Sequence, residues 1–272
     1  RNYAMERFLE RLSASKYRNC FILKGGMLIS AMVGIDSRAT MDIDTTLRNY
    51  PLNCESAEQI VRQIADVEID DKISFVIKKT EEIMEDSEYQ GVRLSLDAYL
   101  DKTRIPLKID ISTGDVITPC EISFSYQLMF ENRTIPLLAY PPETVLAEKL
   151  ETILSRGEAN TRLRDFYDVY ILQREDFVVT PDALCHALLA TCRKRGHEDL
   201  LHTYASILNE VRQSGAMRAQ WMKYQTDFDY AAGITWDTVL DTVETLCMKT
   251  LDDHAFGDEL PQEKSQFEMH LL

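Results

Sequence analysis

The chain has 272 residues, of which 45% are hydrophobic and 28% charged, so it can bury the core of one large domain or two modest ones. Its 45 acidic and 30 basic residues give a formal net charge of −15, which excludes non-specific nucleic-acid binding through the overall electric field. Any RNA substrate would need a local basic patch, and the candidates are Arg193-Lys194-Arg195 and the cluster Arg156, Arg162 and Arg164. The first run is also typical of a solvated helix end.

The sequence lacks the marks of a membrane or secreted protein. No stretch reaches 18 consecutive apolar residues, and the first residues have no signal-peptide apolar core. The six cysteines show neither Cys-x-x-Cys pairs nor histidine partners at ligand spacing, which argues against a zinc site and a disulfide framework. We therefore expect a cytoplasmic protein with reduced thiols and no membrane partner.

The first half of the chain has the spacing of a sheet with a few helices. Alternation of apolar residues predicts strands, and recurrence every three to four residues predicts helices. The expected helices are 1–20, 27–33 and 55–66, and the expected strands are 20–23, 40–47, 73–77, 92–98 and 107–111. These strands predict a largely antiparallel mixed sheet.

Helical patterns dominate after Pro141-Pro142. They cover 143–155, 161–173, 181–195, 198–213 and 235–250, and Thr235 is the expected N-cap of the last helix. The acidic segment after Asp252 is expected to be weakly ordered. We therefore predict an α+β protein with a sheet-based domain over 1–140 and a helical domain over 141–272.

Two acidic residues share one face of the strand predicted over 40–47. Asp42 and Asp44 are two positions apart, so both carboxylates leave the same face while Ile43 anchors the other. Asp is depleted in strands and like charges repel, so a compensating cation is expected. Mg²⁺ uses one or two carboxylates together with substrate phosphate oxygens. The alternative is a solvated edge strand.

A second strand repeats this pattern. Asp110 and Lys108 share a face opposite Leu107, Ile109 and Ile111. If this strand lies beside the first, Asp110 would join Asp42 and Asp44 in one carboxylate cluster able to hold two metal ions. The alternative is a surface pair between Lys108 and Asp110, which would contribute little stability.

The turn Lys24-Gly25-Gly26 lies between a predicted strand and a predicted helix. Glycines allow the backbone to approach a phosphate, and the N–H groups at a helix start can bind one. No Gly-Lys-Ser/Thr follows, so this is not a Walker loop. Its position one short helix before Asp42 would place a triphosphate near the metal.

Opposite charges lean inward from two neighbouring predicted helices. Lys149 lies within the apolar stripe of helix 143–155, and Asp165 shares a face with Val169 and Leu172 in the next helix. A lysine in such a stripe must reach solvent or meet a charge. Either a structural ion pair or a shared polar site accounts for this pattern, with Arg164 and Tyr167 as supporting residues.

Four motifs follow one another in order: Lys24-Gly25-Gly26-Met27, Met41-Asp42-Ile43-Asp44, Lys108-Ile109-Asp110-Ile111-Ser112-Thr113-Gly114-Asp115, and Ala147-Glu148-Lys149-Leu150 with Arg164-Asp165-Phe166-Tyr167-Asp168. As a set they resemble the AbiEii/AbiGii toxin family, which includes the MenT toxins. The resemblance covers roughly residues 20–172. Family members usually have Ser or Thr at or after the glycine turn, whereas Met27 follows Gly26 here.

The resemblance implies a nucleotidyltransferase core like that of DNA polymerase β, with a helical C-terminal domain closing over a nucleotide cleft. It implies Mg²⁺ or Mn²⁺ held by the three strand carboxylates, an NTP as co-substrate, and a cognate antitoxin as partner in a toxin–antitoxin or abortive-infection system. The expected catalytic residues are Asp42, Asp44, Asp110, Lys149 and Asp165. The expected nucleotide-binding residues are Lys24, Gly25, Gly26, Lys108 and Lys149.

The predicted reaction is an in-line attack on the α-phosphate of the NTP, with pyrophosphate as the leaving group. Similarity to the MenT toxins suggests the 3′ end of tRNA as acceptor and arrested translation as the effect. Two alternatives stay open. The chain could modify a protein or a small molecule, or it could be a non-catalytic module that binds a nucleotide or a partner.

Overall fold

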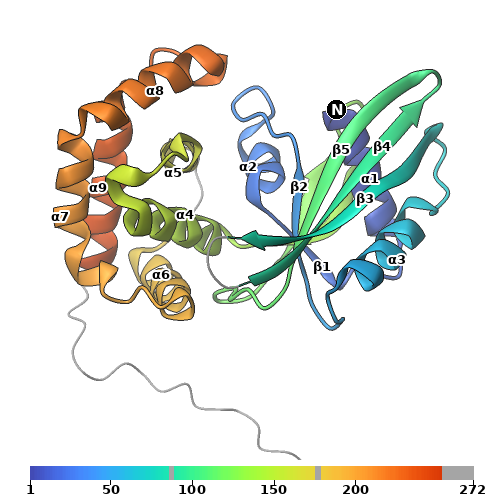
Figure 1. Cartoon of the computed structure of the whole chain (residues 1–272), viewed down its shortest axis with the longest axis horizontal. Helices are drawn as coiled ribbons and strands as arrows, with labels where there is room; N and C mark the ends of the chain where they lie inside the picture. The colour runs from blue at the N-terminus through green and yellow to red at the C-terminus, as the bar shows by residue number, and fades with distance from the viewer. Residues whose placement is uncertain (86–88, 175–178, 253–272) are drawn as a thin grey trace, which may run out of the picture.

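A computed structural model describes residues 1–85, 89–174 and 179–252. Within these residues the chain forms one seven-stranded mixed sheet and nine α-helices. The sheet and three helices come from the first half of the chain, and the remaining six helices form a separate layer (Figure 1). The predicted α+β class with a mixed-sheet core is confirmed.

The sheet has the strand order β3-β4-β5-β2-β1-β7-β6. Strand β2 pairs with β5 in parallel, β1 pairs with β7 in parallel, and the other neighbours are antiparallel. The strands are β1 (Phe21–Lys24), β2 (Ile43–Leu47), β3 (Ile73–Glu85), β4 (Tyr89–Leu100), β5 (Thr103–Ser112), β6 (Ile122–Gln127) and β7 (Thr134–Ala139).

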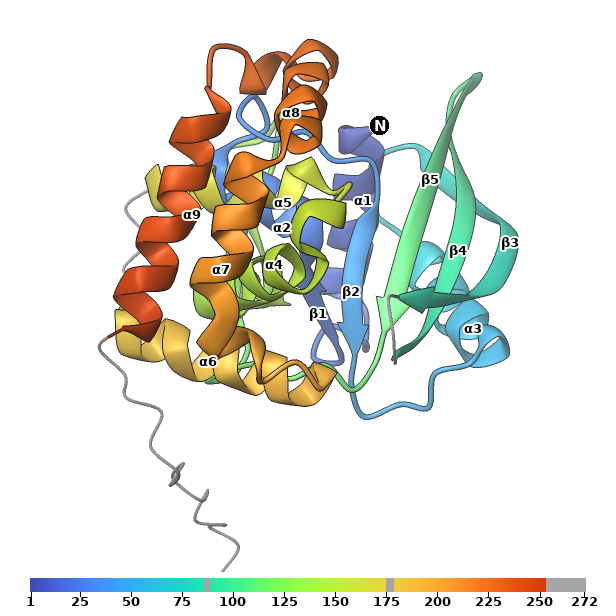
Figure 2. The same cartoon turned by 60° about the vertical axis from the view of Figure 1, so that its left-hand side comes forward.

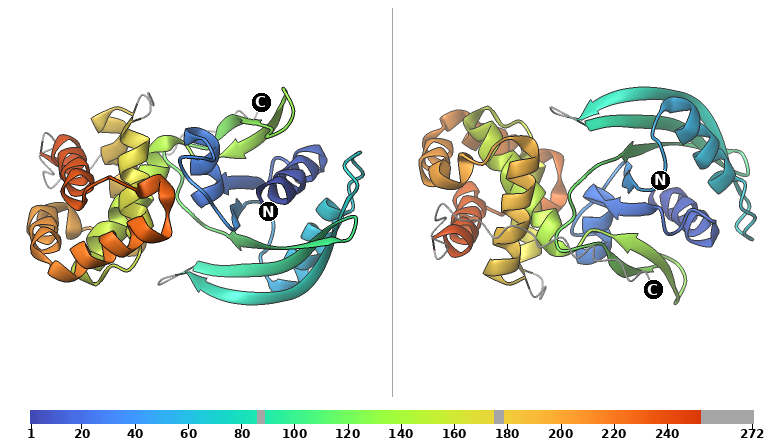
Figure 3. Two further views of the ribbon diagram at one scale, coloured as in Figure 1. Left: turned by 90° about the horizontal axis from the view of Figure 1, so that it is seen from above. Right: turned by 90° about the horizontal axis from the view of Figure 1, so that it is seen from below.

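Helices α1 (Asn2–Ala14) and α3 (Cys54–Ala65) pack against the curved sheet (Figures 2 and 3). The alternation of the strands explains this packing, because Ile43, its register partner Ile109 and the next partner Leu94 all put buried side chains on one face. The opposite face carries the polar members of the same strands. Helix α2 (Gly25–Val33) packs on β1 and β2 and also contacts α5 of the helical layer.

The helical layer begins two residues after β7, where Pro142 starts α4 (Pro142–Arg156). Helix α9 packs on α5, α6 and α7, and Thr235 caps it by accepting a hydrogen bond from the Thr238 N–H, as predicted. The other helices are α5 (Leu163–Arg174), α6 (Pro181–Arg195), α7 (Leu200–Gln213), α8 (Gly215–Asp227) and α9 (Trp236–Leu251). No helix in the described ranges is long and apolar enough to cross a membrane.

Several boundaries differ from the sequence predictions. The first helix ends at Ala14 rather than at residue 20, because Ser15 adopts an extended conformation. Strand β2 begins at Ile43, so Met41 and Asp42, both predicted within this strand, lie outside it, and Met41 is exposed. Strands β6 and β7 and helix α8 were not predicted from the sequence. Helix α8 buries only Met217, Trp221 and Tyr224, a narrow stripe among polar residues.

The boundary between the sheet and the helical layer follows the predicted one near residue 140. The division into two domains, 1–140 and 141–272, remains a prediction. The segment after Asp252, expected to be weakly ordered, lies outside the described residues.

Candidate nucleotide-binding site

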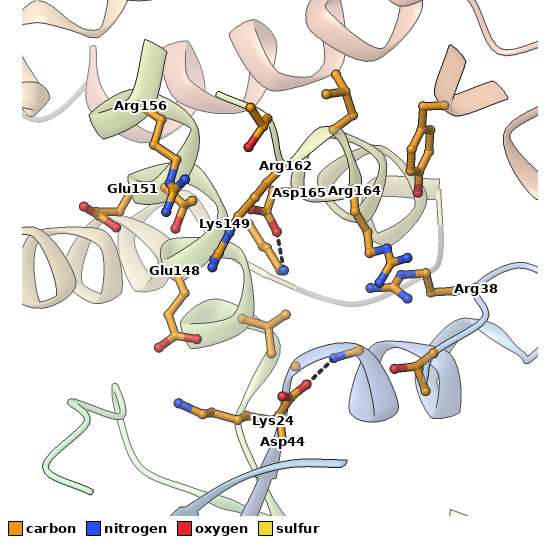
Figure 4. A pocket seen from close by; sticks show the side chains of 18 of the residues that line it. Lys24, Arg38, Asp44, Glu148, Lys149, Glu151, Arg156, Arg162, Arg164 and Asp165 are labelled. Carbon is orange, nitrogen blue, oxygen red and sulfur yellow. Dashed lines mark hydrogen bonds and ion pairs between the residues drawn. The ribbon is translucent and has the colours of Figure 1, made fainter. Parts of the chain in front are cut away.

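A cavity of about 910 Å³ lies between the sheet and the helical layer. Its sheet side is lined by Lys24, Gly25, Gly26, Asp42 and Asp44, and its helical side includes Lys149 and Asp165 (Figure 4). The structure therefore brings together seven of the nine residues predicted for the site. Asp110 and Lys108 are not among the residues that line this cavity.

The glycine turn packs directly against Asp44. Gly25 has a φ of 62°, and a Cβ built on it would lie 2.2 Å from Asp44 Oδ2, so the carboxylate occupies the space that a side chain would need. The N–H of Gly26 donates a hydrogen bond to Asp44 Oδ2 at 3.3 Å. Helix α2 starts at this point, and its N-terminal dipole favours negative charge. The turn thus fixes Asp44 and shapes a place for anionic groups.

Met27, the departure from the family pattern, has a buried side chain that packs in the hydrophobic core. It does not line the cavity. At this position the chain therefore has a side chain packed in the core, where family members have a hydroxyl group.

Four charged residues form one row across neighbouring strands, which we call the strand row. Lys24 is the register partner of Asp44, Asp44 of Asp110, and Asp110 of Arg93. Register partners share a face of the sheet, so the order of charges along the row is positive, negative, negative, positive. The predicted placement of the Asp110 strand beside the Asp44 strand is thus what the structure shows.

Asp110 accepts two hydrogen bonds from Arg93, at 2.7 and 2.5 Å, and is 6% exposed. This bidentate pair occupies both carboxylate oxygens. Lys108 is exposed on β5 and the ion pair of Asp110 is with Arg93, not with Lys108. In the described part of the chain, no three His, Cys, Asp or Glu side chains are grouped so that they could hold a metal ion.

Lys24 forms an ion pair with Asp115, at 3.0 Å between Nζ and Oδ2. The same carboxylate accepts hydrogen bonds from the hydroxyls of Ser112, at 2.6 Å, and Thr46. Burial alone would raise the pKa of Asp115, but the Lys24 cation and the two hydroxyls outweigh it and lower the pKa to about 2. Asp115 is therefore a fixed negative charge that holds Lys24 at the cavity wall.

A second charged group, which we call the charge chain, joins Arg38, Asp168, Lys149 and Asp165. Arg38 donates to both oxygens of Asp168, at 2.6 and 3.2 Å, and Lys149 contacts Asp168 at 3.2 Å and also Asp165. Arg38 and Asp168 are 2% and 0% exposed. Burial alone would lower the pKa of Lys149, but the two carboxylates outweigh it and raise the pKa.

The two carboxylate oxygens of Asp165 differ in their hydrogen bonding, since Lys149 donates to Oδ1. Asp165 is 5% exposed and lines the cavity, and its Oδ2 atom is buried without a hydrogen-bond partner among the described residues. A buried carboxylate oxygen without a partner is costly, so a ligand donor at this position would stabilise the site. This atom marks a point where a bound molecule can donate a hydrogen bond.

Three residues of the site were missed from the sequence. Arg38 lies in the loop between α2 and β2, where no periodic pattern predicts its direction. Asp168 is three residues after Asp165 on a helix, a spacing that could have placed both beside Lys149. Asp115 follows β5 in a loop, and its partner Lys24 is 91 positions away.

Comparison with known proteins identifies the family of this chain. A family model described as "Nucleotidyl transferase AbiEii toxin, Type IV TA system" matches residues 7–242. The solved structure of JHP933 from Helicobacter pylori has 14% sequence identity and a TM-score of 0.48, and the alignment covers 92% of this chain and 91% of that chain. An H. pylori structure described as a "putative nucleotidyltransferase" has 13% identity and a TM-score of 0.49, with coverage of 92% and 95%. No curated protein matched the sequence.

The family match and the fold define the protein as a nucleotidyltransferase by class. The chain belongs to the AbiEii family, the nucleotidyltransferase toxins of type IV toxin–antitoxin systems. Membership of this family implies an antitoxin as partner.

Proposed function

We propose that this protein transfers a nucleotide from an NTP to the 3′ end of an RNA, with tRNA as the expected acceptor, and that this reaction inhibits growth. The observation that carries the proposal is a single cavity. It joins the Gly25-Gly26 turn and the carboxylates of Asp42 and Asp44 to Lys149 and Asp165 from the opposite wall.

Two carboxylates of this cavity are suited to hold a divalent cation. Asp42 and Asp44 both line it and could hold Mg²⁺ or Mn²⁺ together with phosphate oxygens of the nucleotide, a ligand set that Mg²⁺ commonly uses. The bound ion would neutralise charge on the triphosphate. Asp110 would add a third carboxylate only after release from Arg93, so the geometry favours a two-carboxylate site over the predicted three-carboxylate site for two metals.

The protein groups have distinct tasks in this reaction. The start of α2 and Lys24 attract the phosphates, and Lys149 supplies positive charge from the opposite wall. The acceptor hydroxyl oxygen forms a bond to the α-phosphorus, the bond from that phosphorus to the bridging oxygen breaks, and pyrophosphate leaves with the electron pair. The hydroxyl proton passes to a carboxylate or to solvent.

Asp165 is the candidate for orienting a hydroxyl. Its Oδ1 is bound to Lys149, while Oδ2 has no hydrogen-bond partner within residues 1–85, 89–174 and 179–252. A ribose or acceptor hydroxyl that donates to Oδ2 would satisfy this buried atom and be aligned by it.

The test is a label-transfer assay with purified protein, Mg²⁺, each of the four labelled NTPs and total tRNA. We expect wild-type protein to label RNA, and Asp42→Ala to reduce the rate by about a thousandfold or more, because it removes one of the two carboxylates proposed to hold the cation. Asp70→Ala, which removes an exposed carboxylate outside the cavity, is the matched control and should label like wild type.

The alternatives predict other outcomes. Label on a protein or a small molecule instead of RNA would identify that molecule, and not RNA, as the acceptor. Equal labelling by wild type and Asp42→Ala would contradict the assigned chemistry. In cells, induced expression should stop growth with the wild-type chain and not with Asp42→Ala.

A further inference from the structure

We propose that the helical edge of the cavity binds the phosphate backbone and a base of a single-stranded RNA end. We call this surface the basic rim, and it consists of Arg156, Arg162, Arg164, Lys223 and Phe228. The inference rests on the proposed function, because it assigns the surface that would deliver the acceptor to the site.

The charge of the cavity differs from that of the whole chain. Among the described residues that line it, eight are Lys or Arg and seven are Asp or Glu, whereas the full sequence has 30 basic and 45 acidic residues. The eight cations include the four of the basic rim, Arg156, Arg162, Arg164 and Lys223. A polyanion is thus attracted locally by a protein that repels it elsewhere.

The position of the rim suits an acceptor strand. Arg156 ends α4, Arg162 and Arg164 lie at the start of α5, and Lys223 lies on α8. Arg162 and Lys223 are exposed, and Arg156 and Arg164 are half-buried. Figure 4 shows the three arginines on the helical side, facing Lys24 and Asp44 on the opposite wall. A strand held by the rim would therefore end between the two walls.

An aromatic ring lies among these cations. The guanidinium of Arg164 is 5.2 Å from the centroid of the Phe228 ring, which is half-buried and lines the cavity. Tyr224 and Tyr230 support the ring, with centroids at 4.7 and 5.4 Å. Cations that follow a backbone beside an aromatic platform are the arrangement that binds single strands without sequence preference, because every base has a π-face.

The test measures RNA binding without NTP or metal. A fluorescently labelled short single-stranded RNA is titrated by anisotropy over a series of salt concentrations. The triple variant Arg162→Ala, Arg164→Ala, Lys223→Ala should bind roughly tenfold to a hundredfold more weakly, and the slope of log K against log salt should fall by about 2, since each lost phosphate contact removes about 0.7. Phe228→Leu should weaken binding severalfold with an unchanged salt slope.

The matched control removes the same charge from the sheet. Lys78, Lys79 and Lys108 are exposed and lie outside the cavity, so their triple alanine variant should bind RNA like wild type. Circular dichroism and thermal unfolding confirm that each variant is folded. Equal losses in the two triple variants, or unchanged binding in the rim variant, would overturn the basic rim. An unchanged affinity in Phe228→Leu would overturn the stacking platform.

Failure of this inference and failure of the proposed function give different results. Asp42→Ala should bind the RNA as tightly as wild type, because its carboxylate is on the opposite wall. RNA binding that depends on the rim, with no label transfer to RNA, would leave the rim standing and remove the proposed reaction. If the rim triple variant transfers label to RNA as fast as wild type, the proposed reaction would stand and the basic rim would be removed.

Discussion

The strand row and the charge chain face the same cavity but use charge differently. In the strand row the charges come from adjacent strands, and the carboxylate of Asp44 remains at the cavity wall. In the charge chain, Arg38 comes from the loop between α2 and β2, and the other three members come from α4 and α5 of the helical layer. The row therefore places the Asp44 carboxylate at the site, whereas the chain connects the two layers that enclose it.

This difference explains why the two groups are buried to different extents. Asp168 is fully buried and has cations on both sides, as an interior carboxylate requires. Arg93, at the end of the strand row, keeps a third of its side chain exposed. We expect the charge chain to determine stability more strongly, and the strand row to determine chemistry.

The largest stability effect is expected at Arg38. Arg38→Met would leave Asp168 buried with Lys149 as its remaining partner among those described above, and breaking a buried pair in this way costs about 3–5 kcal/mol. Urea unfolding measures the loss. Arg38→Lys keeps the charge but lacks the fork that reaches both oxygens, so it should recover part of the stability.

The matched control for this prediction is an exposed arginine pair. Arg193 contacts Glu198 at 3.0 Å, and its side chain is 51% exposed. Arg193→Met should change the free energy of unfolding by less than about 1 kcal/mol. If Arg38→Met unfolds as easily as this control, the charge chain does not hold the two layers together.

A smaller effect on stability is expected at Asp115, which forms an ion pair with Lys24 of the strand row. Its pKa is lowered from 3.8 to about 2, so the carboxylate contributes roughly 2 kcal/mol above pH 4. Because the folded-state pKa is the lower one, this contribution is lost as the pH falls from about 4 towards 2. Asp115→Asn should thus be less stable than wild type at pH 7, and the difference should shrink at pH 3. A difference that stays constant with pH would contradict the ionic origin of the effect.

Sequence periodicity predicted those site residues whose direction depends only on the strand or helix that carries them. Alternation placed Asp42 and Asp44 towards one cavity, and helical spacing placed Lys149 and Asp165 on facing sides. The glycine turn was predicted for the same reason, since a strand and a helix meet there. Five of the seven described strands and most of the described helices followed from the same periodicities.

Pairings between distant segments could not be predicted in this way. Which cation neutralises Asp110 depends on the register between β4 and β5, and sequence spacing suggested Lys108 where the structure has Arg93. Arg38 lies 130 positions before Asp168 in a loop without periodicity. Strand β7 was missed, although it lies within the sheet between β1 and the edge strand β6.

The smallest effect is expected at Lys108, which lies on β5 two positions before Asp110 of the strand row. The sequence predicted that Lys108 binds the nucleotide, but its side chain is exposed on β5, outside the residues that line the cavity. Lys108→Ala should change NTP affinity by less than about twofold, because an exposed charge outside the cavity is screened by salt. Calorimetric titration with each NTP measures this affinity, with Lys149→Ala as the comparison. A loss as large as that of Lys149→Ala would extend the nucleotide site along β5, beyond the cavity, and would restore the original prediction.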